Sequence, residues 1–261
     1  MRLPPFRPLH LLAALLLATP LLQGCATPPP ADDKEAMEEF RQTNDPAEPT
    51  NRAIYAVNNA LDVMILEPAA RAYRGLTPAP VRSSVHNILS NLGSPVRLAA
   101  DMAQGKPRLA GDTLMRMVIN TTVGLGGVFD VATDWGYPHH DNGAGTTLAV
   151  WGMEEGPYLV LPIFGPSNPR DTGGFLTDMA LDPFTYTSGP SWSIFSYSRI
   201  GATALDERER HIDDVDQIRK QALDSYATFR SLYRQHRAAE IARARMGDKS
   251  WTKPAWFAPS R

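Results

Sequence analysis

Apolar residues recur every three or four positions along most of this chain, and this spacing constrains its fold more than any other feature. The first clear stripe consists of Ile54, Val57, Leu61 and Ile65. A period near 3.6 residues places such side chains on one face of a helix, where they can be buried together. The sequence therefore predicts amphipathic helices and a mainly α fold.

Further stripes predict further helices. The first should stop at Glu67-Pro68, because proline disfavours helix continuation. A second covers 81–92 and ends at Gly93, and a third starts at Ser94-Pro95, with Ser94 as its N-cap, and closes at Gly105. A fourth spans about 107–122. The longest runs from about 206 to 245, with apolar residues on one face and charges on the other.

Residues 124–190 differ, because glycine and proline are dense there and helical spacing survives only around 175–180. Two short segments, 146–151 and 158–164, are predicted to pair as a hairpin across Gly152 to Gly156. Pro162 would confine the second strand to an edge. No internal repeat or second composition block marks another domain, so we expect one domain over 44–245.

The N-terminus has the pattern of a lipoprotein signal. Arg2 and Arg7 precede a Leu/Ala-rich stretch, 9–22, that Pro20 interrupts and that is too short to span a bilayer. It ends in Leu-Gln-Gly-Cys, so 1–24 is predicted to be cleaved and Cys25 to be acylated. The alternative is an ordinary signal with a buried free thiol. Cys25 is the only cysteine, which excludes an intramolecular disulfide.

The segments flanking the domain are predicted to be extended or flexible. Residues 25–43, which contain three consecutive prolines, would form a lipidated tether, and 246–261 a flexible C-terminal tail. Ala26 follows the cysteine where an aspartate would favour inner-membrane retention, so the periplasmic side of the outer membrane is the expected location.

Charge and hydropathy exclude two classes of protein. Without residues 1–24 the chain has 24 basic and 28 acidic side chains, a net charge of −4 with histidine neutral. An acidic domain is a poor nucleic-acid binder. No 18-residue apolar stretch occurs, which excludes a conventional transmembrane helix.

Motifs for catalysis, metals and cofactors are weak. Ser167 and Ser191 lie in Gly-Pro-Ser contexts typical of turns, and no G-x-S-x-G is present. Residues 139–141, His-His-Asp, indicate a solvated loop rather than a metal site. Gly124, Gly126 and Gly127 lack the lysine of a phosphate loop and favour a backbone bend or close crossing. We predict no enzyme, metal or cofactor. The basic C-terminal helix would either meet acidic headgroups or be a solvated face.

A series of motifs resembles the MlaA (VacJ) family of outer-membrane lipoproteins over about residues 44–186. They are Asn44-Asp45-Pro46, Asn51-Arg52, Leu61-Asp62, Pro68, Val81-Arg82, Asn87, Asn91-Leu92, Gln104-Gly105, Arg116, Asn120-Thr121, Gly124, Gly126-Gly127, Phe129-Asp130, Thr147-Leu148, Trp151-Gly152, Gly156-Pro157-Tyr158, Leu161-Pro162, Gly165-Pro166-Ser167 and Arg170-Asp171. Two positions depart from the family pattern, since Ala144 and Ile88 stand where aromatics are usual, so local packing and channel width are in doubt.

The resemblance implies a ring-like helical domain in the inner leaflet of the outer membrane, around a central amphipathic lipid channel. Such a protein removes mislocalised phospholipid from the outer leaflet and passes it to a periplasmic lipid-binding protein, MlaC. Family members commonly sit beside trimeric porins. On this interpretation the channel or gating candidates are Leu148, Val150, Trp151, Gly152, Gly156, Tyr158, Gly124, Gly126 and Gly127.

Two other functions are weighed beside lipid transport. A scaffolding envelope lipoprotein would only brace other proteins and would bind no lipid in its body. A periplasmic lipid hydrolase would need a nucleophile motif, which the sequence lacks. Headgroup preference, the direction of transport and its driving force are not readable from the sequence, and no nucleotide site is recognisable.

Overall fold

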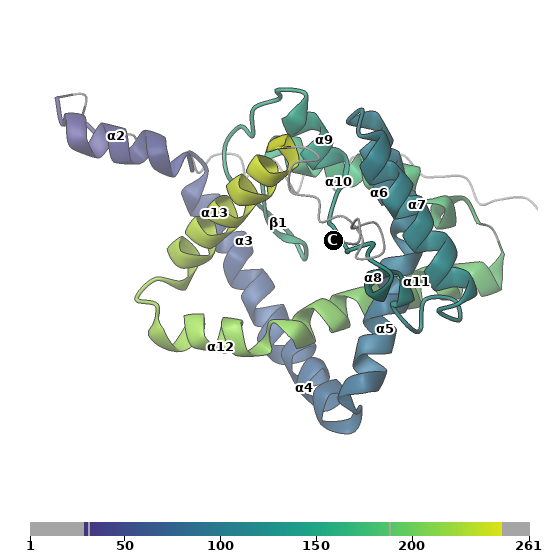
Figure 1. Cartoon of the computed structure of the whole chain (residues 1–261). Coiled ribbons are helices and arrows are strands. Elements are labelled where there is room, and N and C mark those ends of the chain that lie inside the picture. The colour runs from purple at the N-terminus through teal and green to yellow at the C-terminus, as the bar shows by residue number, and fades with distance from the viewer. Residues whose placement is uncertain (1–28, 31, 188, 247–261) are drawn as a thin grey trace, which may run out of the picture. The chain divides into compact units, whose positions relative to one another are not determined.

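The computed structural model describes residues 29–30, 32–187 and 189–246 (Figure 1). The whole predicted signal segment, the predicted acylation site Cys25 with the first residues of the predicted tether, and all but the first residue of the predicted tail lie outside the described residues. The chain forms two compact units. Of the described residues, the first unit contains those up to 59 together with 156–168, and the second contains 60–155 and those from 169 to 246.

The first unit is built from two helices and a small hairpin. Helix α2 (Lys34–Thr43) ends at Asn44, whose left-handed conformation (φ 49°) turns the chain toward α3 (Glu48–Leu61). Strands β1 (Leu159–Leu161) and β2 (Gly165–Ser167) pair antiparallel, with Val160 opposite Pro166. The stretch expected to be a tether therefore contains a helix in its second half.

The second unit is helical throughout its regular elements. They are η2 (Asp62–Leu66), α4 (Glu67–Leu76), α5 (Ala79–Leu92), α6 (Ser94–Ala103), α7 (Pro107–Thr122), α8 (Val131–Asp134), α9 (Ala144–Val150), α10 (Pro169–Leu181), η3 (Pro183–Tyr186), α11 (Pro190–Arg210), α12 (Ile212–Gln221) and α13 (Ser225–Met246). The predicted mainly α class is confirmed, as are the helices at 81–92, 94–103 and 107–122.

Helices of the second unit pack in neighbouring pairs. Figure 1 shows α6 and α7 side by side, joined by a short turn in which Gly105 takes φ +69°. Helix α9 packs closely on α10 and also contacts α13, while α11 packs on α4 and α5. These contacts place the ends of α5, α6 and α7 around the site described below.

The predicted hairpin strand at 146–151 is wrong. These residues belong to α9, and the partner of β1 is the next segment, β2. Thr146, Thr147 and Val150 are β-branched, a residue type that favours sheets. Tertiary contacts override that preference, since the Asp178 carboxylate accepts a hydrogen bond from the Ala144 N–H (2.9 Å) and so caps the first turn of α9.

The predicted helix stop at Pro68 is also wrong, because residues 62–66 form a π-helical turn and α4 follows directly. The Glu67 N–H reaches back to the Asp62 carbonyl, and Pro68 lies in the first turn of α4. A proline there is tolerated because N–H groups of a first turn need no partner in the same helix. Ser94 likewise opens α6 without capping it and donates instead to the Ser90 carbonyl.

The region 206–245, predicted as one long helix, is helical but is divided into three helices by breaks at His211 and at 222–224. The first of these helices, α11, begins earlier than expected, at Pro190. Asp224 causes the second break, because its carboxylate accepts from the Ala227 N–H (3.1 Å) and starts α13. Among the described residues, no helix combines the length and apolar character that crossing a bilayer requires.

Candidate functional site

Four of the predicted gating residues lie on α9 and the turn that ends it. Leu148 and Val150 are half-buried, whereas Trp151 is 64% exposed and its indole N–H donates to the Ala103 carbonyl (3.2 Å). Gly152 is exposed with φ +98°, a conformation that favours glycine. The turn after α9 therefore presents an aromatic ring and a glycine bend to the exterior.

Helix α9 is held by an unusually close helix crossing. A Cβ atom on Gly174 of α10 would lie 2.2 Å from the backbone nitrogen of Gly145 on α9. Only glycine fits at such a distance, because any side chain would overlap the neighbouring backbone. The two helices thus touch through their main chains.

A charged cluster fastens α13 to the same place. Asp171 on α10 accepts hydrogen bonds from Arg237 and from the Tyr233 hydroxyl (2.8 Å), and Arg237 also donates to Thr146 Oγ1 (2.9 Å). Burial alone would raise the pKa of Asp171, but the hydrogen bonds from Arg237, Arg170 and Tyr233 outweigh it and lower the pKa. Burial raises the pKa of Tyr233, and so do the negative charge of Asp171 and the hydrogen bond to it.

Several basic residues of α13 form ion pairs or hydrogen bonds within the second unit. Arg234 pairs with Glu155 (3.1 Å), Arg237 with Asp171, and Arg245 donates to the Ala149 carbonyl (2.9 Å). Arg230 lies over the ring of Tyr226. This arrangement favours packing within the second unit over a basic face for acidic headgroups.

Gly156 and Tyr158 belong to the first unit and serve a different contact. The Asn44 side chain donates to the Gly156 carbonyl (2.8 Å), and the Tyr158 N–H donates to the Asn44 carbonyl (2.8 Å). Asn51 donates to Asp45 (2.8 Å) and to the Tyr158 carbonyl (3.0 Å). The Asn-Asp-Pro motif therefore fixes the start of β1.

The three candidate glycines follow α7. A Cβ on Gly124 would lie 2.4 Å from the Phe129 carbonyl oxygen, so the residue is required by a close backbone crossing, as predicted. Gly126 (φ +75°) has open space around it, and Gly127 (φ +96°) lies against the side chain of Asn91. Gly127 thus brings the glycine segment into contact with α5.

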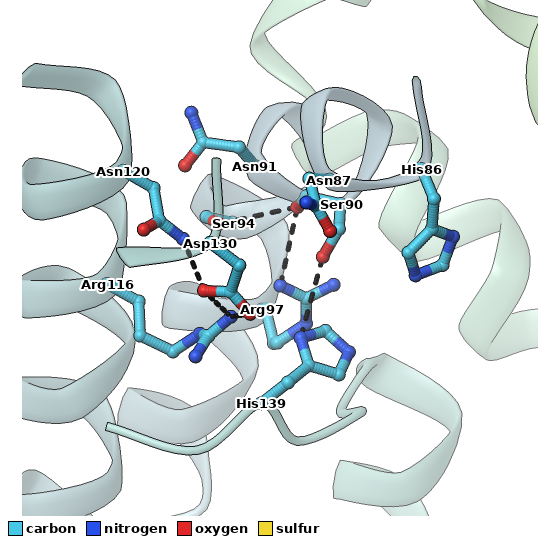
Figure 2. A pocket seen from close by; sticks show the side chains of 10 residues that line it. All are labelled: His86, Asn87, Ser90, Asn91, Ser94, Arg97, Arg116, Asn120, Asp130 and His139. Carbon is cyan, nitrogen blue, oxygen red and sulfur yellow. Dashed lines mark hydrogen bonds and ion pairs between the residues drawn. The ribbon is translucent and has the colours of Figure 1, made fainter. Parts of the chain in front are cut away.

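Asn91 also lines a polar cavity of about 150 Å³ in the second unit, shown in Figure 2. Five of its lining residues belong to the family pattern without any role assigned from sequence, namely Asn87, Asn91, Arg116, Asn120 and Asp130. The other five were not predicted to line a site, although Ser94 was expected as an N-cap and residue 139 in a loop; they are His86, Ser90, Ser94, Arg97 and His139. Four of them recur every three or four residues along α5 and α6, a spacing typical of one helix face, whereas His139 comes from the distant 137–143 segment.

Most charges at the cavity are matched. Arg116, only 7% exposed, donates to both carboxylate oxygens of Asp130 (3.0 and 3.1 Å) and also to Thr133 and the Tyr137 carbonyl. Asn120 donates to Asp130 as well (2.9 Å). Burial would raise the pKa of Asp130, but hydrogen bonds from the Thr133 hydroxyl (2.6 Å), Asn120 and Arg116 lower it, so the carboxylate stays ionised beside its arginine.

The predicted loop at 139–141 is confirmed as irregular backbone, and its two histidines have separate partners. His139 contacts Asp141 (2.9 Å), and His140 contacts the buried Asp101 (3.1 Å). Asp101 also accepts from Thr113 (2.5 Å) and Asn142 (2.7 Å). The loop is thereby tied to α6 and α7 beside the cavity.

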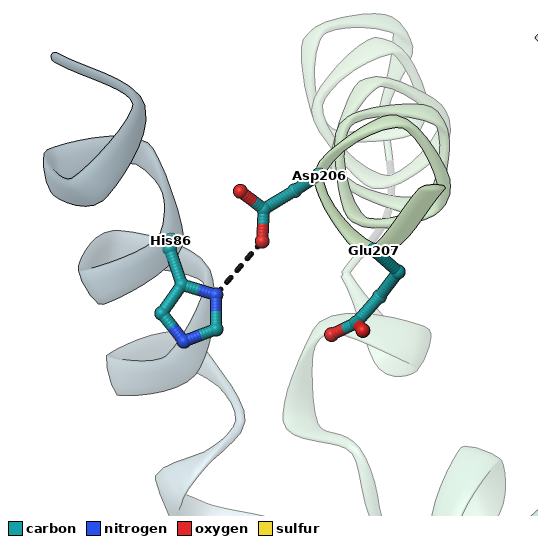
Figure 3. Close-up of side chains that lie close together, drawn as sticks. All are labelled: His86, Asp206 and Glu207. Atoms are coloured by element: carbon teal, nitrogen blue, oxygen red, sulfur yellow. Dashed lines mark hydrogen bonds and ion pairs between the residues drawn. The ribbon is translucent and has the colours of Figure 1, made fainter. Parts of the chain in front are cut away.

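His86 also contributes to the one group of potential cation ligands in the described part of the chain, with Asp206 and Glu207 of α11 (Figure 3). The His86 Nδ1 lies 2.8 Å from Asp206 Oδ2, and the Arg210 guanidinium lies 3.3 Å from the same oxygen. A cation bound there would have to displace the positively charged Arg210 from Asp206. The geometry favours a His–Asp contact that joins α5 to α11.

Neither serine weighed as a nucleophile has the surroundings of one. Ser167 is buried in β2 of the first unit and donates to the Asn168 carbonyl (3.3 Å), and Ser191 is exposed in the first turn of α11.

Fold and site together define a mainly helical protein that buries a number of polar and charged groups and exposes many large apolar side chains. The family model described as "MlaA lipoprotein" matches residues 43–240. The chain belongs to this family.

Individual members of the family also match most of the chain. The chain is 35% identical over 230 residues to the "Intermembrane phospholipid transport system lipoprotein MlaA" of Haemophilus influenzae, covering 87% of this chain and 88% of the relative. It is 33% identical over 233 residues to the protein of that name from Escherichia coli, covering 86% of each. A solved structure described as the "Structural basis for maintenance of bacterial outer membrane lipid asymmetry" matches with a TM-score of 0.66 and 29% identity, covering 76% of this chain and 98% of that one.

Proposed function

We propose that this protein is a lipid-anchored component of the outer membrane that removes mislocalised phospholipid from the outer leaflet. It passes the lipid through an amphipathic channel to a soluble periplasmic carrier of the MlaC kind, and so maintains lipid asymmetry. The protein acts by transport and not by catalysis. Its anchor is the acylated Cys25, and a trimeric porin is a candidate neighbour in the membrane.

The observation that carries this proposal is the distribution of side chains in the second unit. Large apolar residues are exposed along α7, α10 and α11, among them Leu114, Val118, Leu176, Met179, Ile194 and Ile200. The buried positions include many polar and charged groups, such as Asp101, Arg116 and Asp206. A soluble monomer rarely exposes so many large apolar side chains, whereas a protein lying in a leaflet does.

The energetic case follows from the cost of exposing acyl chains to water. Each exposed CH₂ costs about 0.8 kcal/mol, so moving whole tails through water is prohibitive. Amphipathic helices that lie in one leaflet can surround the passage without spanning the bilayer. A single acyl chain anchors weakly, and a multiply acylated cysteine with apolar helix faces anchors firmly.

The names of the relatives support the transport assignment. Proteins called intermembrane phospholipid transport lipoproteins match most of this chain at similar length. The carrier, the porin and the periplasmic-side location are inferred from the family resemblance and from the residues around Cys25.

The proposal is tested by deleting the gene in its own bacterium and restoring it on a plasmid. We expect deletion to raise the phospholipid labelled at the cell surface and to increase detergent sensitivity, and the wild-type gene to reverse both. The double variant Leu176→Glu/Met179→Glu should fail to restore asymmetry, because it places charge on the exposed apolar face of α10. Thr177→Glu is the matched control, since Thr177 is already an exposed polar residue of the same helix.

Unchanged surface phospholipid after deletion would reject the proposal. Native mass spectrometry tests the scaffolding alternative. If the protein needs its anchor and its partners but carries no phospholipid beyond its own acyl chains, it is a scaffolding lipoprotein instead.

A further inference from the structure

Arg97 of α6 stands apart from the other charged groups at the polar cavity. Its guanidinium makes one long hydrogen bond, to the Ser90 carbonyl (3.5 Å), and in the described part of the chain no carboxylate forms an ion pair with it. A guanidinium carries five N–H donors and stays protonated in proteins. Arg97 therefore brings a positive charge and several unused donors to the cavity wall (Figure 2).

The nearby acids are engaged elsewhere. Asp130 is held by Arg116, Asp141 by His139, and Asp101 by Thr113, His140 and Asn142. Asp141 and Asp101 attract Arg97 only from beyond ion-pair distance. With the histidines neutral, the lining residues comprise two arginines and one aspartate, a net charge of +1.

A poorly hydrated cation without a counter-ion is unfavourable. Burial is the largest influence on Arg97 and lowers its pKa, which means that the surroundings do not compensate fully for lost water. Elsewhere in the second unit a buried arginine is paired closely with a carboxylate, as with Arg208 and Asp62 (2.7 Å). An anion in the cavity would supply the interaction that Arg97 lacks.

The remaining lining groups suit an anion. Ser90, Ser94 and Asn87 add hydroxyl and amide groups. At about 150 Å³ the cavity holds a group several times larger than a water molecule.

We propose that this cavity binds the phosphate of a phosphate ester and that Arg97 is its anion-binding residue. The proposal rests on the transport function in one respect, because a phospholipid headgroup is then the expected source of the phosphate. Inorganic phosphate shares the same chemistry and is the alternative source.

The test uses the full lipidated chain, purified in detergent, and titration calorimetry with two soluble probes, glycerophosphoethanolamine and inorganic phosphate. We expect the phosphodiester to bind and Arg97→Gln to weaken it by about tenfold or more, since a charge-assisted hydrogen bond is lost. Arg97→Lys should restore part of the affinity. Lys220→Gln removes an exposed charge on α12 and should leave binding unchanged.

The outcomes separate the sources and the two proposals. Preference for the phosphodiester, with more phospholipid retained by wild type than by Arg97→Gln in native mass spectrometry, supports the headgroup. Preference for inorganic phosphate supports a phosphate site and overturns the headgroup assignment. Absence of binding, or equal binding by Arg97→Gln, overturns the site. If wild type and Arg97→Gln restore membrane asymmetry equally, the transport function stands and the headgroup role fails.

Discussion

Arg237 and Asp171 form a two-pronged ion pair, in which Nε donates to Oδ2 and Nη2 donates to Oδ1, both at 2.8 Å. The pair joins α13 to α10, and the Thr146 hydroxyl of α9 accepts a third hydrogen bond from Arg237. Three helices of the second unit therefore meet at one guanidinium. Such a geometry is more specific than a surface ion pair, because the planar fork fits the carboxylate in one orientation.

Arg237→Met should lower the free energy of unfolding by about 3 kcal/mol, because it leaves a largely buried carboxylate without its main partner. Urea denaturation followed by circular dichroism measures the change. Arg243→Gln, an exposed residue of the same helix, should change stability by less than about 0.5 kcal/mol. Equal losses in the two variants would mean that the pair has no special role.

Acid should weaken the same contact. The pKa of Asp171 is lowered in the folded protein, whereas an unfolded aspartate titrates near 3.9. The stabilisation is present above that value and is lost as the pH falls below about 4, because the unfolded state then binds the proton more readily. Stability measured against pH should therefore fall less steeply in Asp171→Asn than in wild type. Parallel curves would contradict this assignment.

The helix crossing at Gly174 predicts a sharp contrast between adjacent residues. Gly174→Ala should destabilise by about 3 kcal/mol or prevent folding, since its Cβ would overlap Gly145 at 2.2 Å. Gly173→Ala meets open space on the same helix and should be neutral or stabilising by up to about 1 kcal/mol, because alanine favours helices. Thermal unfolding distinguishes them, and similar midpoints would show that α9 can move away.

Two asparagines of α3 bind the same strand of the first unit but differ in burial. Asn51 is 2% exposed, donates to the Tyr158 carbonyl and accepts from the Val160 N–H (2.9 Å). Asn58 makes the matching contacts two helical turns later, to Leu161 and Ile163, in a more exposed position.

Asn51→Ala should cost about 2 to 3 kcal/mol, because buried backbone groups lose their partners. Asn58→Ala should cost about 1 kcal/mol or less, because water can replace the side chain there. Limited proteolysis at the hairpin would report the difference, and a larger effect at Asn58 would contradict the assignment.

Gating by the turn after α9 stays a prediction and can be tested in cells. Gly152→Ala strains a backbone at φ +98° by roughly 1 kcal/mol without any clash, and Leu148→Gln places a polar group on α9. Both should raise surface phospholipid at normal protein levels. Gly201→Ala, on an open face of α11, is the control. Unchanged surface phospholipid and detergent sensitivity in both variants would reject the gate.

The sequence by itself determined the helical class, most helix positions and the family, because periodic apolar spacing and ordered motifs are local properties of the chain. Tertiary structure decided what local patterns cannot encode. The β-branched residues of α9 became helical because Gly174 admits a close neighbour and Asp178 supplies a cap, and α4 continued across Pro68 because a π turn precedes it. Arg97 gained its place at the cavity only when three helices converged, since its environment depends on residues far away in the chain.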